Sequence, residues 1–200
     1  MRNRKHSLFT FVVFALVLVA SSFSARSQPQ TQGNPPSGTS PAQAYFTDIE
    51  LISQDNQTVR LYSDLLKGRV VVINSFYATE HDGCTSMFLN LEKLQTALGD
   101  RVGKDVSFVS ITVDPLIDTP SKLKAFAQRF RALPGWSFIT GKKENVEFAL
   151  KKLGMSAANK DDHSMILIIG NERTGLWKKV LAMARTEDLT KVVLDVLNDK

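Results

Sequence analysis

Continuous apolar runs predict the strands of a central sheet in this chain. Residues 70–76, 106–113 and 164–169 are rich in large and β-branched apolar residues and contain no charged residue. Uncharged runs of this length are typical of strands that are buried on both faces of a sheet. Turn-forming residues at 54–56 and 171–175 lie between further apolar segments, and they predict two hairpins.

Apolar residues at helical spacing fill the intervals between these strands. In residues 84–98 they recur every three or four positions, and Gly99 then ends the pattern. Thr119 and Pro120 are preferred residues for the cap and the first position of another helix, and Thr186 is expected to cap the last helix. This order of strands and helices predicts the α/β class with a thioredoxin-like fold, in which helices flank a mixed central sheet.

The first 25 residues combine a basic start with an apolar stretch. Arg2, Arg4 and Lys5 precede the run 8–20, and small residues follow it. These are the three parts of a secretory signal. The run is shorter than the roughly 20 residues of a spanning helix, but residues up to Phe23 extend it. A cleaved signal peptide and an N-terminal membrane anchor therefore both stay open, and in either case we expect export to the periplasm or cell envelope.

Residues 26–44 form a polar segment with four prolines and no apolar periodicity. Such a composition is typical of a flexible linker without a binding role. The periodic pattern begins at Tyr45. We therefore expect three parts, namely a signal peptide or anchor over 1–25, a linker over 26–44 and one folded domain over 45–200.

The charge of the chain gives little support for a nucleic-acid partner. Its 25 basic and 20 acidic residues give a formal net charge of +5. Three of the basic residues fall in positions 1–25, which leaves 22 basic against 20 acidic residues in the remainder. That remainder has no Lys/Arg-rich run with interleaved aromatic residues, so no nucleic acid is expected as a partner.

Cys84 is the only cysteine in the sequence. An intramolecular disulfide, a dithiol redox pair and a zinc site built from cysteines alone are therefore excluded. The T-x-x-C pattern of thiol peroxidases is also absent, since Thr79 lies five residues before Cys84. The single cysteine thus excludes dithiol enzyme chemistry, and the usual motif of a thiol peroxidase is missing.

Candidate chemistry gathers in residues 77–84, between the first buried strand and the next helix. Glu80, His81 and Cys84 put a carboxylate, an imidazole and a thiol within five residues. Ligand sites of α/β proteins lie at such strand ends, and a helix N-terminus favours a thiolate. His163 comes directly before the third buried strand. By themselves, a lone cysteine and a loop histidine more often have structural or solvated roles.

A longer sequence motif favours functional roles for Cys84 and His163. The run V-D-P-L-I-D-T-P at 113–120, followed by an amphipathic helix to Phe130, closely resembles the SCO/SenC family, copper proteins of cytochrome c oxidase assembly with a thioredoxin-like fold. The segments W-S-F-I-T-G at 136–141 and D-H-S at 162–164 resemble two further motifs of that family. The resemblance covers about residues 45–199. It implies copper as the cofactor and, as the partner, a cytochrome c oxidase subunit or another copper-handling envelope protein.

The sequence departs from the family at the metal site that the resemblance implies. The family binds copper through C-x-x-x-C-P and the histidine of D-H-S. Cys84 matches the second cysteine and His163 the histidine, while Glu80 takes the place of the first cysteine and Thr85 that of the proline. The expected metal ligands are Cys84 and His163, with Glu80 or His81 as an auxiliary donor. Since thiolates select Cu(I), loss of one shifts the preference toward Cu(II) or toward no metal.

Three functions stay open on the sequence alone. The first is a copper-binding assembly factor with a modified site, the second a thioredoxin-fold binding module without metal, and the third a one-cysteine thiol oxidoreductase or peroxidase. Met87 and Met165 are expected to pack in the core rather than to bind metal, because they continue the apolar patterns of a helix and a strand.

Overall fold

The computed structural model describes residues 40–78, 83–155 and 165–200. The signal peptide or anchor expected over 1–25, and the linker as far as residue 39, lie outside these ranges and stay predictions. Within the described ranges, no helix is both long and apolar enough to cross a membrane.

The strands of the described residues are β1 Glu50–Ser53, β2 Thr58–Arg60, β3 Val70–Phe76, β4 Val106–Thr112, β5 Trp136–Thr140, β6 Ile166–Asn171 and β7 Leu176–Leu181. They form one sheet in the order β2-β1-β5-β4-β3-β6-β7. The central strands β3, β4 and β5 run parallel, and every other neighbouring pair is antiparallel. This arrangement confirms the predicted α/β class with a mixed central sheet, including both hairpins.

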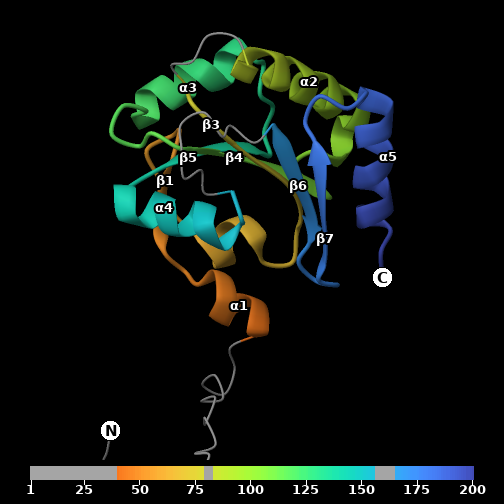
Figure 1. Cartoon of the computed structure of the whole chain (residues 1–200), viewed down its shortest axis with the longest axis horizontal. Coiled ribbons are helices and arrows are strands. Elements are labelled where there is room, and N and C mark those ends of the chain that lie inside the picture. Colours follow the sequence, from red (N-terminus) through yellow and green to blue (C-terminus); the bar gives the residue numbers. More distant parts are fainter. Residues whose placement is uncertain (1–39, 79–82, 156–164) are drawn as a thin grey trace, which may run out of the picture. The chain divides into compact units, whose positions relative to one another are not determined.

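The helices are α1 Pro41–Phe46, α2 Gly83–Leu98, α3 Pro120–Arg129, α4 Lys143–Lys152 and α5 Thr186–Leu197, with the short helical turns η1 Leu61–Leu66 and η2 Gly99–Arg101. One face of the sheet is covered by α2, α3 and α5, and the other by α1, η1 and α4 (Figure 1). Two apolar cores result. We call them the α2 core, around Phe76, Phe88 and Phe126, and the α4 core, around Ile73 and Leu150.

Both cores depend on β3. Val70, Val72 and Phe76 belong to the α2 core, whereas Val71 and Ile73 belong to the α4 core. These five side chains are at most 2% exposed, which confirms the predicted burial on both faces. Because burying one such side chain is worth about 1.5–3 kcal/mol, β3 couples the stability of the two layers.

Aromatic rings fill much of the α2 core. The ring centroid of Phe88 in α2 lies 5.1 Å from that of Phe76, 4.8 Å from that of Phe126 and 5.9 Å from that of Trp136. Such aromatic pairs contribute about 0.5–1.5 kcal/mol beyond the burial of their area. Phe88 therefore holds the N-terminal half of α2 firmly on the sheet.

A polar network crosses strands whose sequence is mainly apolar. The Ser110 hydroxyl donates to Asn74 Oδ1 at 2.7 Å and accepts from Trp136 Nε1 at 2.9 Å. All three residues are buried. A slip in the register of β3, β4 or β5 would leave these groups without partners in an apolar environment, so the network favours the observed pairing.

Two local features differ from the sequence prediction. The first is α1, whose initial residues fall within the expected linker, because Ser40 caps the helix and Pro41 suits its first position. The second is the start of α5, where the predicted Thr186 cap is wrong and Arg185 occupies the cap position. The Thr186 hydroxyl donates instead to Asn90 Oδ1 at 2.9 Å and ties α5 to α2.

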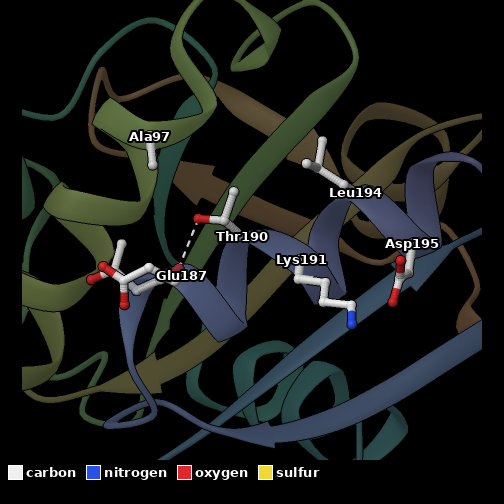
Figure 2. Close-up of a pocket in the computed structure, with 7 residues that line it drawn as sticks. Ala97, Glu187, Thr190, Lys191, Leu194 and Asp195 are labelled. Carbon is white, nitrogen blue, oxygen red and sulfur yellow. Dashed lines mark hydrogen bonds between the residues drawn. The ribbon is translucent and has the colours of Figure 1, made fainter.

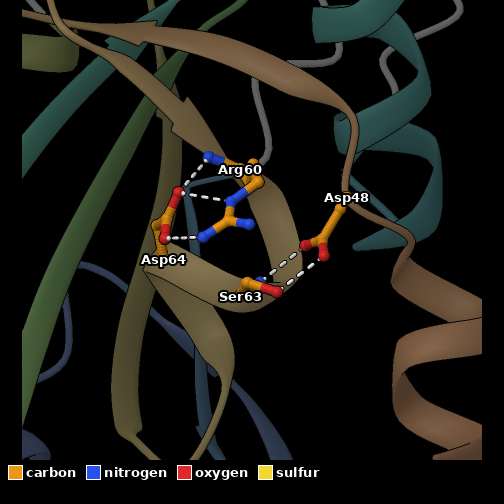
Figure 3. A network of polar contacts seen from close by, with 4 residues as sticks. All are labelled: Asp48, Arg60, Ser63 and Asp64. Atoms are coloured by element: carbon orange, nitrogen blue, oxygen red, sulfur yellow. Dashed lines mark hydrogen bonds and ion pairs between the residues drawn. The ribbon is translucent and has the colours of Figure 1, made fainter. Parts of the chain in front are cut away.

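Charged and polar contacts hold the segment that leads into β3 (Figure 3). Arg60 Nη2 lies 2.9 Å from Asp64 Oδ1, and the Arg60 backbone N–H donates to Asp64 Oδ2 at 2.7 Å. Ser63 donates from its N–H and its hydroxyl to the Asp48 carboxylate at 2.7 and 2.6 Å. The hydrogen bonds from Arg60 hold the pKa of Asp64 below its ordinary value of 3.8.

We expect Asp64→Asn to destabilise the protein by about 0.5–1 kcal/mol at neutral pH, the range of exposed ion pairs. Because folding lowers the pKa of Asp64, its contribution is present above the ordinary Asp pKa and is lost as the pH falls through the lowered value. In urea unfolding, the gap between wild type and variant should be constant from about pH 7 to 5 and should shrink toward pH 3. Asp105→Asn, whose carboxylate lies 4.0 Å from Arg101, is the control and should change less. A gap that widens in acid would contradict the assignment.

Candidate metal centre

The predicted site belongs to the edge of the sheet at which β3 ends. β3 and β4 pair in parallel from Val70↔Val106 to Phe76↔Thr112. The segments that follow both strands therefore leave the sheet at the same edge. The Val113 N–H continues the contact beyond the strands by donating to the Phe76 carbonyl at 2.9 Å.

The third buried strand starts at this same edge. β6 is antiparallel to β3, with Val70 paired to Asn171 and Ile73 to Ile168. Its first residue, Ile166, is therefore nearest the end of β3. The topology thus brings three segment ends together, one after β3, one after β4 and one before β6.

Most of the predicted ligands fall on residues that the structure does not describe. Glu80, His81 and His163 lie outside the described ranges. Cys84 is described as part of the first turn of α2, which begins at Gly83. Among the described residues, no three His, Cys, Asp or Glu side chains gather into a group that could hold a metal. The proposed ligand set therefore stays a prediction.

The two methionines considered as sulfur donors differ in burial. Met87 is 1% exposed and belongs to the α2 core, as its helical spacing predicts. Met165 is half-buried and packs against the same core. The packing role expected for both is confirmed.

Asp118, which the sequence analysis did not single out, links two segments at this edge by hydrogen bonds. The Asp118 carboxylate, through Oδ2, accepts from the Thr112 hydroxyl at 2.5 Å and from the Ala78 N–H at 3.1 Å. Asp118 is fully buried, and its Oδ1 has no hydrogen-bond partner among the described residues. It therefore links the end of β4 to Ala78, near the start of the predicted metal loop. The sequence signals this role only by placing an acid between a strand and a Thr-Pro helix start.

Exposed apolar side chains flank the same edge. Leu116 is 73% exposed and Ile117 46% exposed in the segment between β4 and α3. Leu181, which pairs with Ile166 at the start of β6, is 68% exposed, and the neighbouring Met183 is also exposed. Large exposed apolar residues that gather in one place mark interaction surfaces more often than scattered ones do.

A hollow of about 470 Å³ between α2 and α5 is a separate feature, shown in Figure 2. Its lining includes Ala97 of α2 and Thr190, Lys191 and Leu194 of α5. Ala97 lies near the C-terminal end of α2, about 20 Å along the helix axis from Cys84 at a rise of 1.5 Å per residue. None of the described residues that line the hollow is a predicted ligand.

The residues that form this sheet and its helices match one protein family. Residues 37–196 match the family described as SCO1/SenC. The chain belongs to the SCO1/SenC family. The match spans all the strands and helices from β1 onward except the last residue of α5. The resemblance expected from the sequence motifs is thereby confirmed.

Curated and solved SCO1/SenC proteins agree with this assignment. The SCO1 protein homolog of Bacillus subtilis (strain 168) is 35% identical over 102 residues, which are 50% of this chain and 51% of that protein. The chain spans about half the length of the curated relatives it matches. The SCO1/SenC family lipoprotein of Bacillus anthracis str. Ames has a TM-score of 0.63 at 26% identity, over 74% of this chain and 92% of that one.

A more distant structure shows the same fold. Yeast Sco1 with copper bound has a TM-score of 0.63 at 19% identity, and the match covers 76% of this chain and 90% of that one. The neighbours are thioredoxin-like, which confirms the predicted fold.

We expect Asp118→Asn to cost about 1–3 kcal/mol, because it replaces a buried carboxyl group that accepts two hydrogen bonds with an amide. The measurements are urea unfolding and the hydrogen-exchange protection of the Ala78 amide, which should fall more than that of core amides. Asp114→Asn, four residues earlier in the same segment, is the control and should stay within about 0.5 kcal/mol of wild type. Equal effects of the two substitutions would contradict the linking role of Asp118.

Proposed function

We propose that this SCO1/SenC protein is an exported copper-binding protein of cytochrome c oxidase assembly with a modified metal site. The observation that carries the proposal is the common sheet edge. α2 begins at this edge with Cys84 in its first turn, and the chain enters β6 there three residues after His163. Two residues about 80 positions apart in the sequence are thus proposed to meet at this edge.

The proposed ligands are Cys84 and His163, with Glu80 or His81 as an auxiliary donor. One thiolate and one imidazole suit copper, since thiolates select Cu(I) and imidazole also suits Cu(II). Yeast Sco1, which shares the fold, is described with copper bound. With Glu80 where the family has a cysteine, we expect Cu(I) to be held less firmly than by two thiolates. In this account copper is the cargo that the protein hands on.

The chain's own residues prepare the site in two ways. The first turn of a helix stabilises a thiolate, because its free N–H groups and the helix dipole favour negative charge, and Cys84 occupies such a turn. Asp118 fixes the Ala78 N–H and so orients the start of the loop that leads to Glu80 and His81. A preset loop lowers the ordering cost of binding the metal.

The partner is proposed to dock at the same edge. Leu116, Ile117, Leu181 and Met183 present exposed apolar surface beside the segments that carry the ligands. A cytochrome c oxidase subunit, or another copper-handling envelope protein, would bury this surface as it takes copper. Desolvated apolar contacts of this kind supply much of the energy of transient protein interfaces.

Export is proposed from the first 25 residues, as a cleaved signal peptide or as an anchor, with the linker as a spacer. The relative from Bacillus anthracis is described as a lipoprotein. Fractionation distinguishes the alternatives, since a cleaved protein would be recovered with soluble envelope proteins and an anchored one with membranes.

We expect Cys84→Ala to abolish Cu(I) binding, because it removes the only thiolate, and His163→Ala to weaken it strongly. Glu80→Cys should tighten Cu(I) binding on the order of a hundredfold, because it restores a second thiolate at the family spacing. The affinities are measured on the full chain by competition with a chromophoric Cu(I) chelator.

Met87→Leu is the control for these variants, since it changes a sulfur in the α2 core and should leave the affinity unchanged. If wild type and Cys84→Ala bind copper equally, or if neither binds and Glu80→Cys gains nothing, the metal proposal is wrong. The second outcome favours a thioredoxin-fold binding module that acts by protein contact alone.

The single cysteine also limits the redox products of the chain. With diamide as the oxidant, two Cys84 thiols from two molecules lose two protons and two electrons, and one intermolecular disulfide forms. Non-reducing gels should then show monomer and some dimer for wild type and no dimer for Cys84→Ser. Turnover of a disulfide substrate at dithiol-enzyme rates would contradict this assignment and favour the thiol oxidoreductase.

A further inference from the structure

A groove on the α4 side of the sheet lies away from the proposed metal edge. Its volume is about 420 Å³, within the range of about 300–1,000 Å³ that is typical of ligand pockets. α1 contributes Tyr45 and Phe46, α4 contributes Lys152, and β7 contributes Trp177, Lys178 and Lys179. Trp177 pairs with Gly170, and Gly170 pairs with Val71 near the start of β3, the end opposite Phe76.

The aromatic walls of the groove are held in place by specific contacts. The ring centroids of Phe46 and Trp177 are 5.6 Å apart, and those of Tyr45 and Phe46 are 5.0 Å apart. The Tyr45 hydroxyl donates to the Lys152 carbonyl at 3.2 Å and so closes α1 onto the end of α4. These contacts leave a preformed apolar floor rather than a gap that side chains could fill by small shifts.

A glycine makes the position of Trp177 possible. A Cβ atom on Gly170 would lie 2.0 Å from Trp177 Cε3, well inside van der Waals contact. The indole therefore lies flat against the backbone of β6, where any other residue would displace it. Trp177 is half-buried, which leaves part of its ring as lining of the groove.

Two ammonium groups stand at the rim of this apolar floor. Lys152 Nζ lies 4.3 Å from the ring centroid of Tyr45, and Lys179 Nζ donates to the Gly154 carbonyl at 3.3 Å. Within the part of the chain that the structure describes, neither of them forms an ion pair with a carboxylate. The Lys152 ammonium lies over an aromatic ring, and both ammonium groups lack a carboxylate partner among the described residues, which favours an anionic occupant.

We infer that the groove binds an amphipathic anion, an apolar chain or ring that ends in a carboxylate or phosphate. The apolar part gains from leaving water, at about 25 cal/mol per Å² of buried area, and the anionic end pairs with Lys152 and Lys179. This site is independent of the proposed copper function, because its lining comes from the α4 side and from the opposite end of β3.

A lysine beside Lys152 provides a matched control. Leu176 and Val180 pack against the α2 core and Trp177 against the α4 core. Since side chains alternate along a strand, Lys179 shares the face of Trp177, and the Lys178 side chain lies on the other face. Lys178 nevertheless belongs to the lining of the groove, so the control is Lys151→Gln, which removes a lysine charge next to Lys152 from an exposed residue that is not among the described lining residues.

The test is a titration of the full chain with dodecyl phosphate below its micelle concentration. Trp136 is buried, so a change in tryptophan fluorescence reports on Trp177, and Trp177→Phe should remove the signal. We expect saturable binding that Lys152→Gln and Lys179→Gln each weaken by about threefold to tenfold, and Lys151→Gln by less than about twofold. Ala42→Leu, which adds bulk to the lining, should weaken binding without loss of circular dichroism.

Three further probes separate the sources of the signal. Dodecyl maltoside and inorganic phosphate, which have only the apolar or only the anionic part, should bind much more weakly. Equal binding of either one, or equal loss in all three lysine variants, would overturn the inference. Binding to anionic phosphatidylglycerol vesicles without binding to monomeric dodecyl phosphate would overturn it as well, in favour of a membrane surface.

Discussion

Because β3 and β4 pair in parallel over their whole lengths, the chain leaves both strands at one edge of the sheet. The antiparallel pairing of β6 with β3 then starts β6 at that same edge. The helices follow from this constraint, since α2 and α3 must cross back over the sheet to reach the next parallel strand. Asp118 adds a hydrogen-bonded link between the two parallel strand ends, at Thr112 and Ala78. The pairing of β3 with β4 and β6 therefore stabilises the sheet and also defines the edge of the proposed site.

Much of the fold could be predicted because its signals are local and periodic. The apolar run at β3 has the predicted bounds, and α3 begins at Pro120 behind a Thr119 cap, as its residues indicate. Other features depend on contacts between distant segments and leave no local pattern. Thr186 has the chemistry of a helix cap, but its hydroxyl bonds Asn90 of α2 instead. The position of α1 was missed because its cap at Ser40 lies in a segment whose composition is that of a linker.

The candidate site, too, could be predicted only in part. The residue types at Cys84 and His163, and their places next to predicted buried strands, could be read from the sequence, and the topology places the ends of β3 and β4 and the start of β6 at one edge. The role of Asp118 could not be predicted, because it arises from a fold in which an acid six residues after Thr112 reaches back to the end of a different strand. The groove at Trp177 was hidden for a similar reason. It requires Gly170, a cross-strand neighbour whose importance appears only in the register of β6 and β7.

The metal is thus proposed at the edge where β3 ends, and the amphipathic anion on the α4 face of the sheet. The central claim is that copper binds at the edge through a single thiolate. Copper K-edge X-ray absorption of the copper-loaded full chain tests it most directly, because sulfur and nitrogen or oxygen neighbours scatter differently. The account predicts one sulfur neighbour per copper together with nitrogen or oxygen neighbours, and no sulfur neighbour in the Cys84→Ala protein. A wild-type spectrum with nitrogen and oxygen neighbours alone, unchanged by Cys84→Ala, would contradict it.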